Sequence, residues 1–296
     1  MCRLDAREEM EDEAAWPKAN PRLNYSPELR LEYRADVREW RRNPLRHPMT
    51  PTKRFNMPEE RRDVAVTDYA NLVAASRPVD VDALRGRPCV VGIDYAKTND
   101  MVGAVALFKV GGEYQVIPYA WWCTRSSDAD AVRAPLAEWA GRGIMRLVDD
   151  VEVPPGMVAR WVAGIATAYD VRMVALDSFR YALLAKALAE VGFDGSERGE
   201  GQRVWLTRPS DVMRVQPVID SAFSTRSIAW GESPLMRWAT NNAKLEPAPN
   251  NCYKFGKIEP HSRKTDPFMA LVHAFTVADR IPDDMASEPF AEPLFF

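Results

Sequence analysis

The sequence has few of the residues that hold a zinc ion or form disulfides. Its four cysteines include no Cys-x-x-Cys pair, and its 296 residues contain three histidines. Zinc fingers and zinc ribbons need clustered cysteine and histidine ligands, so this scarcity argues against both. A disulfide framework is equally unexpected in a chain of this size. Cys89 and Cys123 lie in apolar runs, which predicts that both are buried as small hydrophobic residues.

Other absences restrict the class of protein further. No apolar run approaches the roughly 20 residues that a membrane-spanning helix needs, and the N-terminus lacks the apolar core of a signal peptide. We therefore expect a cytosolic protein with no membrane partner. The chain has no Gly-x-x-x-x-Gly-Lys-Ser/Thr phosphate loop, which excludes that type of nucleotide site. Many DNA-binding proteins have a net positive charge and a basic surface, whereas this chain has a net charge of −3. A local basic groove around an acidic site is still compatible with that charge.

What the chain does contain is an ordinary globular composition, with 46% hydrophobic and 27% charged residues. Residues 1–25 are polar and contain prolines, so we expect them to be extended. Ser26 and Pro27 predict the start of a helix with an arginine-rich face, since serine caps helices and proline fits their first position. Proline and charge then dominate up to Pro88. We assign residues 1–85 to a linker or arm, residues 86–282 to one domain, and residues 283–296 to a flexible tail.

After Pro88 the chain alternates between short apolar runs and helical patterns. Residues 89–93 form a continuous apolar run, which is typical of a strand buried on both faces. Residues 101–110 and 114–122 flank a Gly-Gly pair and predict a hairpin. Three leading strands followed by alternating helices and strands predict a mixed α/β sheet flanked by helices. This order of elements fits the ribonuclease H-like fold.

Three aspartates stand at the ends of predicted strands or at the start of a helix. Asp94 and Asp177 each end an apolar strand, and Asp266 precedes Pro267 at the start of the final helix. Each has an ordinary alternative, as a solvent-facing turn residue for Asp94 and as helix caps for the other two. Strand ends and helix starts at one edge of an α/β sheet converge on a single crevice. We therefore expect the three carboxylates to lie together.

Carboxylates gathered in one crevice are typical ligands of hard cations. Mg²⁺ in proteins is held by one or two carboxylates together with substrate phosphate oxygens. Two such ions about 3.5–4 Å apart activate a water molecule and stabilise the leaving oxygen of a phosphodiester. The sequence thus predicts a phosphodiester-cleaving centre that holds two hard cations such as Mg²⁺. Asp94, at the end of the central strand, is the natural ligand to bridge them.

Further charged residues near these positions are candidates for supporting roles. Asp100 and Glu259 are possible accessory acids. Phosphate contacts usually come from lysine and arginine, and the candidates that precede the final helix are Lys257, Arg263 and Lys264. For each of these five residues, a solvated surface position is the ordinary alternative.

Several short motifs resemble, in the same order, those of phage terminase large subunits. Residues 16–21, Trp-Pro-Lys-Ala-Asn-Pro, resemble the Trp-x-x-Ala-Asn-Pro segment that follows the ATPase core, and residues 54–56 resemble a linker element. Residues 91–94 are similar to the opening strand of the terminase nuclease, and residues 175–177 to its second acidic strand. Its closing signature resembles Asn242-Ala243, Asn250, Lys257 and residues 264–271, with Thr265 in place of the usual isoleucine. The resemblance is to the C-terminal nuclease region and spans nearly the whole chain.

This resemblance implies a metal-dependent endonuclease that cuts concatemeric double-stranded viral DNA during genome packaging. Mg²⁺ or Mn²⁺ would be its cofactor, with Asp94, Asp177 and Asp266 as catalytic metal ligands. Residues 1–85 would follow an ATPase domain that is missing from this sequence, so we expect no ATPase activity in this chain. The implied partners are double-stranded DNA, the terminase ATPase domain, the small terminase subunit and the portal protein, in the cytoplasm of the infected bacterial host.

Three alternative interpretations remain at this point. Another ribonuclease H-like DNA enzyme, of the resolvase or transposase type, would use the same acids, although the closing motif favours a terminase. Residues 92–98 also resemble the phosphate loop of actin-like ATPases and sugar kinases, but Ala96 stands where that loop needs glycine. A non-catalytic packaging assembly module would use the aspartates only as caps. The presence of acids at all three positions disfavours this last alternative.

Overall fold

The computed structural model describes residues 2–42, 47, 49–57, 64–96, 101–196, 199–249 and 252–282. Asp100, Asn250 and the predicted tail after residue 282 lie outside these ranges. Contacts within the chain divide it into two units, Met1–Arg62 and Asp63–Phe296. No helix in the described ranges is long and apolar enough to span a membrane.

The first unit is helical and has its own apolar core. Trp16, Tyr33 and Phe55 are buried there, and their ring centroids lie 5.4 to 6.1 Å apart. Burial of these large side chains draws the segment before the predicted helix into short turns, so the prediction that residues 1–25 are extended is wrong. The elements of this unit are η1 (Arg7–Glu11), η2 (Trp16–Lys18), η3 (Pro21–Asn24), α1 (Pro27–Arg42) and α2 (Thr50–Phe55).

The helix predicted from Ser26 and Pro27 is confirmed as α1. The Ser26 side-chain oxygen accepts a hydrogen bond from the Leu29 backbone N–H at 3.3 Å, as an N-cap does. Several arginines of its polar face are engaged within the unit. Arg34 forms an ion pair with Glu13 at 2.6 Å, and the resulting hydrogen bonds lower the pKa of the Glu13 carboxyl.

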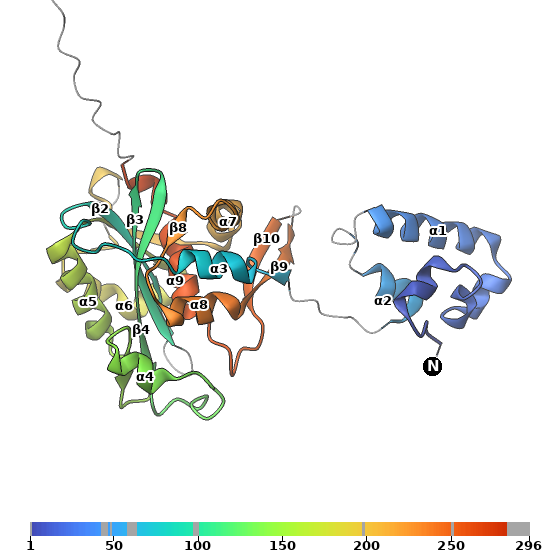
Figure 1. Cartoon of the computed structure of the whole chain (residues 1–296), viewed down its shortest axis with the longest axis horizontal. Helices are drawn as coiled ribbons and strands as arrows, with labels where there is room; N and C mark the ends of the chain where they lie inside the picture. Colours follow the sequence, from blue (N-terminus) through green and yellow to red (C-terminus); the bar gives the residue numbers. More distant parts are fainter. Residues whose placement is uncertain are drawn as a thin grey trace, which may run out of the picture. The chain divides into compact units, whose positions relative to one another are not determined.

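The second unit is built on a mixed sheet with the strand order β5-β4-β3-β2-β6-β7. Figure 1 labels its strands β2, β3 and β4. The predicted hairpin is confirmed, and its turn residues Gly111 and Gly112 adopt φ of 58° and 81°, which glycine tolerates without strain. Antiparallel pairing joins β2 (Pro88–Asp94), β3 (Val102–Val110) and β4 (Glu113–Cys123). Parallel pairing adds β6 (Asp170–Asp177) beside β2 and β7 (Val204–Thr207) beside β6. It also adds β5 (Arg146–Val148) and β8 (Ile228–Ala229) beside β4.

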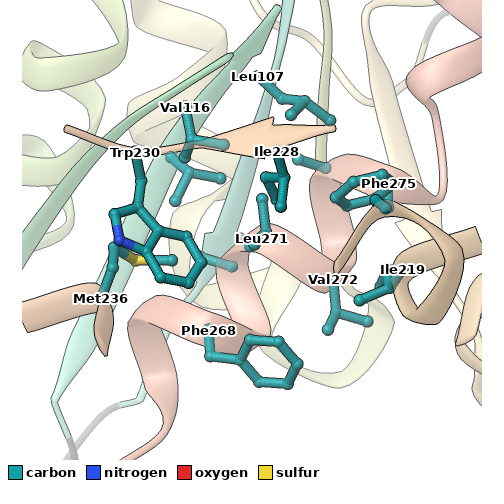
Figure 2. Close-up of a cluster of buried hydrophobic side chains, with 14 of the residues drawn as sticks. Leu107, Val116, Ile219, Ile228, Trp230, Met236, Phe268, Leu271, Val272 and Phe275 are labelled. Atoms are coloured by element: carbon teal, nitrogen blue, oxygen red, sulfur yellow. The ribbon is translucent and has the colours of Figure 1, made fainter. Parts of the chain in front are cut away.

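Helices cover both faces of this sheet. Apolar residues of α5 (Pro155–Ala168) and α6 (Ser178–Glu190) pack on one face, together with the buried Cys89 and Cys123. Figure 2 shows the core on the other face, where α7, α8 and α9 meet the strands. The helices of this second face are α3 (Tyr69–Ala75), α7 (Pro209–Ser224), α8 (Pro234–Asn241) and α9 (Asp266–Phe275).

The remaining elements lie outside these two layers. A small antiparallel sheet has the order β1-β9-β10, so that β9 and β10 form a hairpin. Its strands are β1 (Val64–Ala65), β9 (Ala243–Ala248) and β10 (Cys252–Lys257), and the other short helices are α4 (Leu136–Gly141), η4 (Gly199–Gly201) and η6 (Ala278–Arg280).

Residues 64–85 belong to the unit that contains the sheet. Val66, Leu72 and Ala75 are buried in the same core as α7 and α9. The contacts therefore divide the chain after Arg62, whereas the sequence predicts a boundary after residue 85. Prolines and charged residues dominate the sequence of this region, so its few apolar residues form no clear pattern there. The core of the second unit nevertheless buries several of them.

Helix α9 packs closely against the middle of the sheet. A Cβ atom added to Gly92 in β2 would overlap the Ala270 carbonyl oxygen, and one added to Gly103 in β3 would overlap the Asp266 carbonyl oxygen. Only glycine allows backbones to approach so closely. Gly103 is the ladder partner of Asp94, so this packing holds the start of α9 beside the end of β2.

Candidate active site

Asp94 and Asp177 end two neighbouring parallel strands. Ile93 in β2 is opposite Leu176 in β6, and the aspartates are the next residue of each strand. Both aspartates line one cavity of about 770 Å³. The walls of this cavity come from the starts of α6 and α7, the β9–β10 hairpin and α9. The convergence predicted for these two strand ends is therefore present.

Asp177 also caps α6. Its Oδ1 atom accepts a hydrogen bond from the Phe179 backbone N–H at 2.7 Å. The capping alternative for this residue is thus correct, and it is compatible with a second role. A carboxylate has two oxygens that each accept more than one bond, so the cap leaves acceptor positions for a cation.

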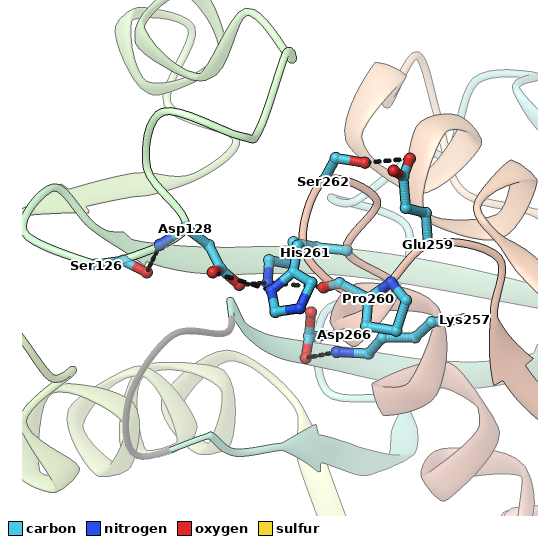
Figure 3. Close-up of polar contacts among 9 residues, drawn as sticks. Ser126, Asp128, Lys257, Glu259, Pro260, His261, Ser262 and Asp266 are labelled. Carbon is cyan, nitrogen blue, oxygen red and sulfur yellow. Dashed lines mark hydrogen bonds and ion pairs between the residues drawn. The ribbon is translucent and has the colours of Figure 1, made fainter.

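Asp266 is the first residue of α9 and is 2% exposed. Its Oδ1 atom lies 3.4 Å from Lys257 Nζ, and Figure 3 shows this ion pair. A buried carboxylate is costly unless it is paired, and Lys257 supplies an opposite charge. The carboxylate of Asp266 does not line the cavity. The Asp266 backbone nevertheless packs against Gly103, which is the ladder partner of Asp94 in β3.

Lys264, one of the predicted phosphate contacts, does not line the cavity. Lys264 is 1% exposed, and its Nζ atom donates to Asp128 Oδ2 at 2.6 Å and to the Pro260 carbonyl at 2.9 Å. This hydrogen bond, assisted by His261, holds the pKa of the Asp128 carboxyl below its ordinary value. A lysine buried in this way fixes the segment before α9 and does not suit a direct contact with DNA phosphate.

Arg263 and Glu259 lie on the surface of the same segment. Both are exposed, and their side chains approach to 3.9 Å. Glu259 Oε2 also accepts a hydrogen bond from the Ser262 hydroxyl (Figure 3). Neither residue lines the cavity. Asp100, the predicted accessory acid, lies outside the described residues.

Several cavity residues carry no distinctive signal in the sequence. His273 on α9 is 4% exposed and faces the cavity. Burial lowers the pKa of its imidazole to about 4, against the opposing charge of Asp177, so the ring is neutral at pH 7. Arg180 and Arg208 also line the cavity. Each follows the end of a core strand by one to three residues, which is the only hint that the sequence offers.

The carboxylates fit part of a hard-cation site. Within the described ranges, no three His, Cys, Asp or Glu side chains are grouped closely enough to hold a metal ion by themselves. Mg²⁺ sites commonly have one or two carboxylates and complete their coordination with water and substrate phosphate. Asp94 and Asp177 on one cavity match that donor set.

Comparisons with known proteins identify the family. The family model for the terminase large subunit, endonuclease domain, matches residues 1–280. No curated protein sequence matches the chain. Among solved structures, the chain is similar to the large terminase of bacteriophage HK97, with a TM-score of 0.65 and 18% identity, over 94% of this chain and 56% of that one. It is also similar to the large terminase nuclease of the thermophilic phage G20c, with a TM-score of 0.47 and 10% identity, over 72% of this chain and 98% of that one.

The match to the HK97 protein confirms the predicted ribonuclease H-like fold. A third similar structure is the nuclease domain of the bacteriophage SPP1 large terminase with bound Mn, with a TM-score of 0.39 and 14% identity, over 67% of this chain and 90% of that one. This chain spans little more than half of the HK97 terminase. With the family model covering nearly its whole length, the chain belongs to the family of terminase large subunit endonuclease domains.

Proposed function

We propose that the second unit cuts double-stranded viral DNA during genome packaging, using divalent cations bound by its aspartates. The observation that carries this proposal is the pairing of Asp94 and Asp177 at the ends of adjacent parallel strands on one cavity. In a protein of the terminase endonuclease family, two such carboxylates are best explained as cation ligands. A purely structural role explains the cap made by Asp177, but it gives no reason for Asp94 to line the same cavity.

The residues of this chain would divide the work as follows. Asp94 and Asp177 would hold Mg²⁺ or Mn²⁺, with Asp94 shared if two ions bind. Such ions, when bound, activate water and stabilise charge on the phosphodiester oxygens. Asp266 would be the third acid, and the positive charge of Lys257 beside it would offset the cost of burying its carboxylate. His273, neutral at pH 7, adds no positive charge to repel a cation.

The wider setting is also a proposal, because the chain spans 56% of the HK97 terminase. The terminase ATPase domain, the small terminase subunit and the portal protein would be its partners. Cutting would take place in the cytoplasm of the infected bacterial host. ATP hydrolysis would be performed by the ATPase domain and not by the residues of this chain.

A plasmid cleavage assay tests the proposed function. The purified chain is incubated with supercoiled DNA and Mn²⁺ or Mg²⁺, and nicked and linear products are measured. We expect cleavage that EDTA stops and that Asp94→Asn abolishes while the protein stays folded. Asp220→Asn is the matched control, because Asp220 is an exposed aspartate of α7 that does not line the cavity. Full cleavage by a well-folded Asp94→Asn protein would contradict the proposal.

A further inference from the structure

Phe179 is 83% exposed at the mouth of the cavity. It is the second residue of α6, and its backbone N–H is held by the Asp177 carboxylate. Phenylalanine contributes most to stability when its large apolar surface is buried. Here the side chain is instead exposed to water, two residues from a proposed metal ligand. An exposed aromatic side chain at this place is suited to contact the substrate.

The cavity is larger and more apolar than a site for phosphate and cations alone needs to be. Its volume of about 770 Å³ is within the range of about 300–1,000 Å³ for sites that bind small organic ligands. Val212, Met213 and Met269 line it together with the carboxylates that end β2 and β6. Carboxylates, which would attract a phosphate through a bound cation, and apolar side chains in one cavity match a nucleotide, which joins a charged phosphate to a base with apolar faces.

Positive charge surrounds the same cavity. Arg180 and Arg208 are exposed and line it, and neither forms an ion pair in the part of the chain that the structure describes. Lys254 also lines the cavity, and its Nζ atom lies 3.6 Å from a carboxylate oxygen of Glu246. Phosphate oxygens are the usual partners of such arginines at a DNA surface. A DNA strand whose phosphates meet Arg180 and Arg208 would have a phosphodiester close to Asp94 and Asp177.

We infer that this cavity receives one unstacked nucleotide of the DNA strand that is cut, and that Phe179 stacks on its base. The inference rests on the proposed function and specifies how that site holds its substrate. In an intact duplex the bases are stacked within the helix, so one must leave the stack to reach Phe179. Stacking on an aromatic side chain offsets that cost and works with any base. The contact therefore does not depend on which base stands at the cut site.

Photocrosslinking tests the stacking directly. Duplex DNA with 5-iododeoxyuridine in place of thymidine is bound to the whole chain in EDTA, irradiated, and digested for peptide mapping by mass spectrometry. We expect a crosslink to Phe179 that Phe179→Leu removes. A chain that binds this duplex and crosslinks only elsewhere would overturn the inference. Because no divalent cation is present, this result does not depend on whether the chain cleaves DNA.

Cleavage rates give a second, independent readout. We expect Phe179→Ala and Phe179→Leu to slow plasmid cleavage about tenfold or more, as loss of a base-stacking aromatic does, and Phe179→Trp to restore it. Tyr69→Ala is the control, because Tyr69 is 66% exposed on α3 and lies outside the cavity. Equal rates for the wild type and Phe179→Leu would overturn the inference and leave the proposed function intact. Cleavage by Asp94→Asn would instead contradict the proposed function.

Discussion

His273 is a residue whose chemistry its sequence context does not suggest. It lies in an apolar helix, is almost fully buried, and has an imidazole pKa of about 4 instead of the ordinary 6.5. Burial depresses the pKa because the protonated ring loses its hydration, and the negative charge of Asp177 only partly compensates. The ring is therefore neutral at pH 7 and adds no positive charge beside Asp177.

This depressed pKa predicts an acid-dependent loss of stability. Between pH 6.5 and pH 4 the unfolded state binds a proton at this position and the folded state does not, so stability is present above the unfolded pKa and is lost as the pH falls. The loss should be roughly 3 kcal/mol from pH 7 to pH 4. Urea unfolding without divalent cations at several pH values, for wild type and His273→Gln, measures it. An identical pH dependence in both proteins would contradict the assignment.

Other residues show where single positions could be predicted and where they could not. The strand-end position of Asp94 and Asp177 is visible as an acid after an apolar run, and the cavity contains both. Lys264 follows no such local rule. Its orientation is set by Asp128, which lies 136 residues earlier in the chain. A basic residue next to a signature motif therefore resembles a DNA contact until its distant partner is known.

At the scale of elements, the position of α9 against the sheet decides where Asp266 lies. Two glycines, Gly92 and Gly103, allow the helix backbone to touch β2 and β3. The sequence predicted the strands, the final helix and the mixed sheet. It could not predict this contact, because a glycine within a strand has several explanations, and only the tertiary packing selects among them.

Gly103→Ala should therefore disturb the site through the helix. Its new methyl group would overlap the Asp266 carbonyl, so the start of α9 must shift. Overpacking of this kind costs about 1–3 kcal/mol, and we expect cleavage to fall further than the loss of folded protein explains. Thermal unfolding and plasmid cleavage measure the two effects. Gly164→Ala in α5 is the control, since its added methyl meets nothing within 4 Å. Wild-type stability and activity in Gly103→Ala would contradict the packing account.

At the scale of the whole molecule, the chain consists of two units with separate cores. The sequence predicted a nuclease domain preceded by an arm, but the first unit has a core of its own. Trp16, Tyr33 and Phe55 are far apart in the sequence, and no periodic pattern links them before the turns form.

The arginines of α1 are less available for contacts with DNA or a partner than their number suggests. Arg34 forms an ion pair with Glu13, and Arg41 lies near Glu11.

The central claim is that the aspartates at the edge of the sheet bind the cation that cleavage requires. Crystals of the whole chain soaked in Mn²⁺ test it most directly, because the anomalous signal locates manganese without reference to activity. We predict manganese between the carboxylates of Asp94 and Asp177, with Asp266 turned toward the same ion or a second one. Manganese bound elsewhere, or no manganese beside Asp94 in a protein that cleaves DNA only with this ion, would contradict the claim.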